Sequence, residues 1–342
     1  MAYRKGEIGS ISIYSLKEYI KPDKLQPVYF FYGVDTFAIE NGVKEIEKVA
    51  APFLMSDFDK EIISAEKKQK ISEIIDLAYA FPFGNGKKLM IVKNFENISD
   101  KKNFVSYIEN PSETTILVLI YNGKINNLAS GPYKLLAQKK YLFEAKELKG
   151  KELINWLILQ AGSLELNLSA ENALALIDIV GSSTSLLQMQ LHKFKNFLGN
   201  ESEISLEIIE KLSSATKEHN IFELQEALGR GSKKKSLQII YNLLESGQEL
   251  TMIIAMLAKF VSVAAQSIEL SAKHTPDDAA AKAIGISRFY YKKCKSAAFF
   301  KSHTRLKIAG QALFNADLLL KTTSTGNKTI ATKLISEIFI NE

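Results

Sequence analysis

The first 143 residues alternate short apolar runs with helical patterns, and this alternation stops there. One run, Pro27-Val-Tyr-Phe-Phe-Tyr-Gly33, is apolar on both faces, as in a strand buried on both sides. The predicted strands are residues 27–33, 58–63, 89–92, 115–121 and 141–143. The predicted helices are residues 14–20, 37–49, 71–80, 100–108 (with Ser99 as a cap) and 132–140. This spacing predicts an α/β domain whose parallel sheet is covered by helices on both faces.

Every pattern after Lys149 is helical. Three helices, at about residues 153–160, 173–180 and 187–198, form a predicted small bundle, and Gly181 and Gly199 close the last two. Further predicted helices are residues 221–228, 236–245, 250–270, 279–284, 288–299, 306–320 and 330–340. We therefore expect three domains: an α/β domain of residues 1–143, a small helical domain of residues 144–204 and a larger helical domain of residues 205–342.

The composition is that of a soluble protein with more than one domain. The chain has 342 residues, too many for one ordinary core, and 46% of them are hydrophobic and 24% charged. No apolar run reaches the roughly 18 to 20 residues that span a bilayer, and no signal peptide follows Met1, so we expect a cytoplasmic protein. The single cysteine, Cys294, cannot form an internal disulfide, which fits a reducing compartment.

The charge allows nucleic-acid contact of one kind only. The net charge is +6, and only four of the 44 basic residues are arginines: Arg4, Arg230, Arg288 and Arg305. Because lysine cannot make the bidentate contacts by which arginine reads bases, any contact with nucleic acid should be a diffuse, salt-sensitive attraction to the backbone.

The segment Phe81-Pro-Phe-Gly-Asn-Gly86 is an unusual loop, because it carries two large aromatic side chains beside a stiff proline. The glycines and the asparagine tolerate a tight turn between the predicted helix 71–80 and the next strand. Two interpretations follow. The rings of Phe81 and Phe83 either fold back as a lid over the core, or protrude as an anchor for another protein.

The start of the α/β domain suggests a nucleotide site, but the motif is absent. A phosphate-binding loop would read Gly-x-x-x-x-Gly-Lys-Ser/Thr, whereas Gly33 is followed by Val-Asp-Thr-Phe-Ala-Ile. The strand 115–121 runs into Asn122-Gly-Lys124 instead of the acidic pair that would hold a metal ion. Residues 84–88 and 229–235 have the composition of phosphate loops without their spacing. We therefore predict no nucleotide cofactor.

The remaining reactive side chains form no catalytic pattern. His192, His219, His274 and His303 lack spaced metal-binding partners, so we expect no zinc site. Cys294 lies among lysines that could lower its pKa, but no histidine accompanies it. The segment Tyr290–Lys307 interleaves aromatic and basic residues, as in single-strand binding, although a helix with its aromatics inward and its lysines outward is favoured.

Several segments, in order along nearly the whole chain, resemble the delta subunit of the bacterial DNA polymerase III clamp loader. They are residues 27–40, 81–84, 88–94, 116–120, 152–156, 180–181, 185–193, 218–224, 243–248 and 316–321. The resemblance implies a non-catalytic subunit with a degenerate AAA+ (RecA-like) α/β domain that lacks an ATP site. Its third domain, residues 205–342, would form part of a helical collar.

The resemblance also implies partners and a site. The partners would be the sliding clamp (beta), the gamma/tau and delta prime subunits and primed DNA, with no membrane. The clamp would bind a hydrophobic tip that corresponds to Phe81, Pro82 and Phe83. The family usually has Pro-Phe-Phe or Ser-Leu-Phe here, and we expect Phe83 to enter the clamp with Phe81 beside it. The alternatives are a nonstandard NTPase and a helical nucleic-acid-binding adaptor.

Overall fold

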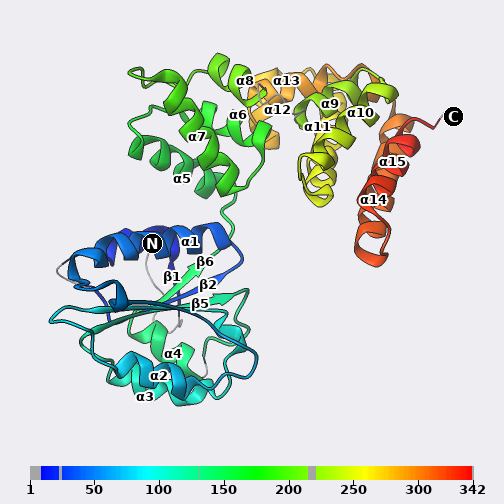
Figure 1. Cartoon of the computed structure of the whole chain (residues 1–342). Coiled ribbons are helices and arrows are strands. Elements are labelled where there is room, and N and C mark those ends of the chain that lie inside the picture. Colours follow the sequence, from blue (N-terminus) through cyan, green and yellow to red (C-terminus); the bar gives the residue numbers. More distant parts are fainter. Residues whose placement is uncertain (1–8, 23–24, 130, 215–220, 341–342) are drawn as a thin grey trace. The chain divides into compact units, whose positions relative to one another are not determined.

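The computed structural model describes residues 9–22, 25–129, 131–214 and 221–340 (Figure 1). The chain divides into two compact units, Met1–Glu147 and Leu148–Glu342, and each is described by itself. The predicted fold class is confirmed, because the first unit contains a parallel sheet and the second contains only helices among its described residues. The predicted three-domain division at residues 143 and 204 stays a prediction.

The first unit is built on a six-stranded sheet in the order β1-β6-β2-β5-β4-β3, and every pair is parallel. The strands are β1 (Ile11–Ser12), β2 (Val28–Gly33), β3 (Lys60–Ser64), β4 (Lys88–Lys93), β5 (Thr115–Asn122) and β6 (Leu142–Ala145). All six residues of β2 are buried between β5 and β6, which confirms the prediction of a strand covered on both faces.

Helices cover both faces of this sheet. The α-helices are α1 (Thr36–Ala50), α2 (Ile71–Tyr79), α3 (Phe104–Glu109) and α4 (Gly131–Gln138). The 3₁₀ turns are η1 (Ile13–Glu18), η2 (Ala51–Phe53), η3 (Asp57–Asp59), η4 (Phe95–Asn97) and η5 (Lys101–Asn103). Helix α1 lies on one face and α2, α3 and α4 lie on the other (Figure 1). Successive rings of β2 therefore pack on opposite sides: Phe30 contacts Phe95 at 5.0 Å between centroids, and Phe31 contacts Phe143 at 5.7 Å.

Several predicted boundaries in the first unit are wrong. Strand β1 was not predicted, because two residues carry no periodic pattern. The strand predicted from Phe58 begins at Lys60, since Ser56 caps a 3₁₀ turn over residues 57–59. Ser99 is not a helix cap, because its hydroxyl donates to the carbonyl oxygens of Lys68 and Gln69. Helix α3 begins only at Phe104, after η5.

The described residues of the second unit form a series of helices. They are α5 (Gly150–Ser163), α6 (Ala170–Val180), α7 (Thr184–Leu198), α8 (Leu206–Ser214), α9 (Ile221–Gly229), α10 (Lys233–Glu245), α11 (Leu250–Ala272), α12 (Asp277–Ile284), α13 (Arg288–Lys295), η6 (Ala298–Phe300), α14 (His303–Thr322) and α15 (Asn327–Ile338). Gly181 and Gly199 follow α6 and α7 with positive φ, as predicted. Helix α8 was not predicted, and the helix predicted over residues 288–299 ends at Lys295.

Helix α11 corrects the prediction that no apolar segment is long enough to cross a membrane. It has 23 residues and a mean hydropathy of 1.7 over its most apolar window, and half of that window is buried inside the protein. Helices α6 and α7 are long and apolar enough to cross a membrane only when they are counted together as one span, which is bent by 118° between them. Side chains of α11 such as Leu257 and Phe260 are buried, and the helix contacts α9, α13 and α14. We therefore interpret α11 as the core helix of the second unit.

A buried carboxylate joins three helices of the second unit. Asp178 of α6, whose side chain is 1% exposed, accepts hydrogen bonds from the Lys259 ammonium of α11 and from the backbone amide of Ser287, each at 2.7 Å. Ser287 is in turn the N-cap of α13. Because a buried carboxylate is costly unless it is paired, these contacts fix how the three helices pack.

We expect Asp178→Ala to lower the free energy of unfolding by about 2 kcal/mol or more, because it leaves a buried amide and an ammonium without their acceptor. Urea unfolding followed by helical circular dichroism measures the change. Asp317→Ala is the matched control: it removes an exposed pair with Lys321 within α14, and its cost should stay below about 0.5 kcal/mol. Equal costs for the two variants would contradict the role of Asp178.

Candidate functional site

Four exposed apolar side chains form what we call the apolar tip of the first unit: Met55, Phe58, Phe81 and Phe83. Their exposed fractions are 65%, 74%, 85% and 78%, in that order. Met55 and Phe58 lie in the connection from α1 to β3, whereas Phe81 and Phe83 lie in the connection from α2 to β4. The rings of Phe58 and Phe83 have centroids 5.4 Å apart. The interpretation of Phe81 and Phe83 as a lid over the core is therefore wrong.

The topology of the sheet brings the two connections together. Strands β3 and β4 are parallel neighbours, with Lys60 opposite Leu89, so the segments that enter them lie side by side at the amino edge of the sheet. Ligands of open α/β sheets usually bind at the opposite, carboxyl edge. The apolar tip therefore lies away from the usual small-molecule site of such a fold.

The carboxylate of Asp59 ties the two connections to each other. This side chain is buried, and it accepts hydrogen bonds from the amides of Met55 and Ser56 at 3.2 and 3.0 Å and from the amide of Phe83 at 2.7 Å. Phe58 and Asp59 were not predicted as site residues, because the apolar pattern from Phe58 onward predicts a strand. The available signal was Ser56-x-x-Asp59, a capping-box pattern, which the structure forms.

The glycines of the loop allow a close approach of the two backbones. A Cβ atom on Gly86 would lie 2.3 Å from the carbonyl oxygen of Phe53, and that oxygen accepts a hydrogen bond from the Lys87 amide at 2.8 Å. Below the loop, the buried Lys88 ammonium contacts Glu61 at 2.8 Å and the carbonyl of Leu77, at the end of α2, at 3.1 Å. Hydrogen bonds beside the loop thus hold it against the connection from α1 to β3 and against the end of α2.

At the carboxyl edge, the turn between β2 and α1 is filled by the protein itself. The amides of Val34 and Asp35, which would contact phosphate in a nucleotide-binding loop, both donate to the carbonyl oxygen of Ala145, at 3.0 and 3.1 Å. The Asp35 carboxylate caps α1 through the amide of Ala38 at 2.9 Å and accepts from the Tyr14 hydroxyl at 2.6 Å. A negative charge already occupies the helix end that would attract a phosphate.

The ends of β4 and β5 are also paired internally. The Glu96 carboxylate accepts hydrogen bonds from the backbone amide and the side-chain amide of Asn122, at 3.1 and 3.2 Å, and Asn122 also donates to the Asn94 side chain. In the part of the chain that the structure describes, no three histidine, cysteine or acidic side chains are grouped as a metal site. His219 lies outside the described residues.

The aromatic and basic segment of the second unit spans α13, η6 and the start of α14, and the inward placement of its aromatic rings that the favoured interpretation predicts is confirmed for three of them. Tyr290, Tyr291 and Phe300 are buried, whereas Lys295 pairs with Asp277. The lowering of the Cys294 pKa by a neighbouring lysine, Lys293, is outweighed by burial of the thiol. Burial raises the pKa of its thiol to about 12. A thiol of this kind remains protonated at neutral pH and is a poor nucleophile.

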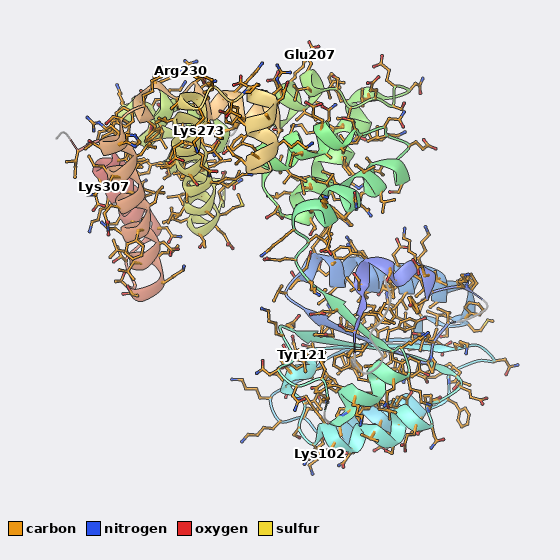
Figure 2. The ribbon with its side chains drawn as sticks, turned by 180° about the vertical axis from the view of Figure 1, so that it is seen from behind. Lys102, Tyr121, Glu207, Arg230, Lys273 and Lys307 are labelled. Carbon is orange, nitrogen blue, oxygen red and sulfur yellow. The ribbon has the colours of Figure 1, made fainter. Side chains whose placement is uncertain are left out.

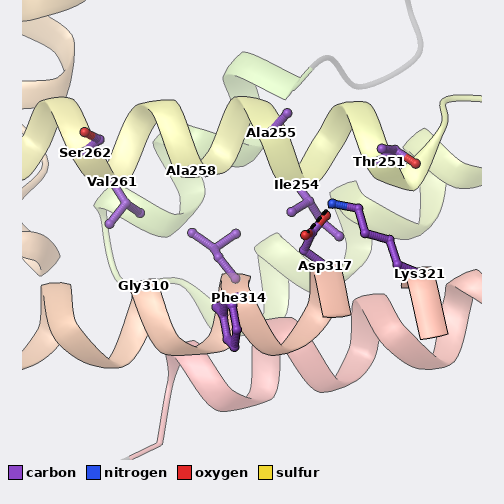
Figure 3. A pocket seen from close by; sticks show the side chains of 11 residues that line it. Thr251, Ile254, Ala255, Ala258, Val261, Ser262, Gly310, Phe314, Asp317 and Lys321 are labelled. Carbon is purple, nitrogen blue, oxygen red and sulfur yellow. Dashed lines mark hydrogen bonds and ion pairs between the residues drawn. The ribbon is translucent and has the colours of Figure 1, made fainter. Parts of the chain in front are cut away.

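The surface has two further features: a groove on the second unit, and exposed basic side chains on both units. A groove of about 620 Å³ lies between α11 and α14, and its lining includes Ala258, Gly310 and the exposed ring of Phe314 (Figure 3). Exposed basic side chains occur on both units, for example Lys102 in the first and Lys307 in the second (Figure 2). No pattern in the sequence predicts the groove.

Comparison with known proteins gives matches in both units. The family model described as DNA polymerase III, delta subunit, matches residues 29–146, and a second model, for the C-terminal domain of the same family, matches residues 218–338. The chain is 26% identical over 338 residues to DNA polymerase III subunit delta of Bacillus subtilis (strain 168), with 96% of each protein covered. The solved DNA clamp loader delta protein of Bacillus subtilis is 24% identical and has a TM-score of 0.57, and the match covers 96% of this chain and 99% of that one. This structural likeness shows a shared fold.

We expect Cys294 to resist alkylation by iodoacetamide at about pH 8 in the folded protein and to react fully in denaturant, because the buried thiol stays protonated and inaccessible. Mass spectrometry counts the modified residue. The variant Phe83→Cys provides an exposed thiol as a positive control. Rapid stoichiometric alkylation of Cys294 without denaturant would contradict the burial.

Calorimetric titration with magnesium-ATP tests whether the turn between β2 and α1 can bind a nucleotide. We expect no saturable binding up to about 1 mM nucleotide, which corresponds to a binding free energy weaker than about −4 kcal/mol. The reason is that the Ala145 carbonyl and the Asp35 carboxylate occupy the groups that would hold phosphate. Tight saturable binding by the isolated chain would contradict this expectation and favour an NTPase.

Proposed function

This chain belongs to the DNA polymerase III delta subunit family, and from this premise we propose that it is a non-catalytic subunit of the replicative clamp loader that binds the sliding clamp. In the proposal, Phe81, Pro82 and Phe83 contact the clamp and help to open it for loading onto primed DNA. The chain would work in the cytoplasm as one part of the DNA polymerase III holoenzyme.

The apolar tip is the single observation that carries this proposal. Soluble proteins rarely expose large apolar side chains in one cluster without a binding role. Here the rings of Phe58 and Phe83 adjoin, and Phe81 is 85% exposed beside the half-buried Pro82. A rigid aromatic anchor buries much area on binding and loses little conformational entropy.

The proposed mechanism is differential binding. A tip that fits the opened clamp better than the closed clamp shifts the equilibrium toward opening by the difference between the two binding free energies. This step needs no nucleotide on the delta subunit. The turn after β2, whose amides bind the Ala145 carbonyl, supports this view. ATP would then act through the partner subunits and not through this chain.

We propose that residues 205–342 form the collar that meets the gamma/tau and delta prime subunits. The groove between α11 and α14 lies in this region and exposes Phe314. Lysines would add a diffuse attraction to primed DNA within the complex, since lysine binds phosphate as a point charge. The paired groups at the carboxyl edge of the sheet count against the alternative of a nonstandard NTPase.

We expect the double variant Phe81→Ala, Phe83→Ala to bind the sliding clamp of the same organism roughly a hundredfold more weakly, a loss of about 3 kcal/mol, because both anchors are removed. Surface plasmon resonance on immobilised clamp measures the affinity, and thermal melting checks the fold. Phe197→Ala removes a ring of α7 that is 50% exposed in the other unit and should leave clamp binding unchanged. Normal clamp binding by the double variant would refute the role of these rings.

A further inference from the structure

Phe58 is an exposed ring that core packing does not explain. It is 74% exposed, close to the 78% of Phe83, although the two residues come from different connections. Their rings lie 5.4 Å apart with planes at 42°. Met55 adjoins the same surface, because its Cβ atom would lie 3.1 Å from a Cβ atom on Gly84. The exposed apolar surface is therefore shared between two connections.

The buried carboxylate of Asp59 determines the shape of that surface. It holds the amides of Met55 and Ser56 in one connection and the amide of Phe83 in the other. The hydroxyl of Ser56 accepts from the amide of Phe58 at 3.2 Å, which fixes the second ring from its own backbone. Both adjoining rings are thus held through backbone groups that depend on this one turn.

Two ion pairs lie on the elements that adjoin this surface. Lys60 pairs with Glu47 at 3.0 Å, and Lys88 pairs with Glu61 at 2.8 Å. These four side chains come from α1, β3 and β4. With those charges paired, a partner surface that matches the tip should be an apolar pocket wide enough for two neighbouring rings.

We propose that the sliding clamp binds a folded surface made of both connections, with Phe58 and Met55 as binding residues beside Phe81 and Phe83 and with Asp59 as the positioning residue. This inference rests on the proposed function, since it concerns the same tip and the same partner. Binding to a preformed surface avoids the cost of ordering a loop. A linear segment that contains only the second connection lacks half of that surface.

Clamp affinity of single variants tests the inference. We expect Phe58→Ala to weaken binding by about tenfold or more, as truncation of an anchor does. Because Phe58 is exposed, its removal should leave the melting temperature unchanged. We also expect a synthetic peptide of residues 77–87 to bind the clamp at least about a hundredfold more weakly than the whole chain. Phe197→Ala serves again as the control ring.

The role of Asp59 needs a measurement that a loss of stability alone would not change. Asp59→Asn offers one acceptor oxygen where the carboxylate offers two, so it cannot hold both connections. We expect this change to weaken clamp binding about tenfold alone, but much less when Phe58→Ala and Phe83→Ala are both already present, because it acts through those two rings. Hydrogen exchange at the Phe83 amide should also become faster. An equal loss in both backgrounds would overturn the positioning role.

The outcomes separate the inference from the proposed function. If Phe58→Ala or the peptide binds as tightly as the unaltered chain while the Phe81 and Phe83 double variant does not bind, the inference is wrong and the proposed function stands. If the unaltered chain does not bind the clamp, both are wrong. Weakening by Phe58→Ala together with weak binding of the peptide supports recognition of the folded surface.

Discussion

The parallel pairing of β3 with β4 is the constraint on which the tip depends. Parallel neighbours start at the same edge of a sheet, so the segments that enter them lie side by side. In this protein those segments carry Phe58 and Phe83, whose rings adjoin although 25 positions separate them in sequence. The Asp59 carboxylate then joins the two segments through their amides. The pairing of two neighbouring strands thus forms one apolar surface from residues that are far apart in the sequence.

The two edges of the sheet have opposite characters. At the carboxyl edge, the polar groups are used within the protein: the Ala145 carbonyl takes two amides and the Asp35 carboxylate caps α1. At the amino edge, the side chains of the apolar tip are exposed to solvent. An α/β fold usually places its chemistry at the carboxyl edge. In this member of the delta subunit family, the exposed surface suited to binding lies at the amino edge instead.

Much of the fold could be predicted, because the patterns behind it are local. The buried run that became β2 and the glycines after α6 and α7 needed only periodicity and turn chemistry. The predictions that were wrong involved contacts from elsewhere in the chain. Strand β1 exists only through its pairing with β6, and Ser99 turns its hydroxyl to the carbonyls of Lys68 and Gln69 instead of to a helix.

The sequence by itself determined the fold class, the family resemblance and the loop that carries Phe81 and Phe83, since each depends on local patterns or on the order of such patterns along the chain. It left open whether those rings are buried, because burial depends on which segments pack against the loop. Only the tertiary structure decided that they are exposed and that Phe58 joins them. The physical reason is that Asp59 forms its hydrogen bonds across two connections, and no local pattern encodes a contact between them.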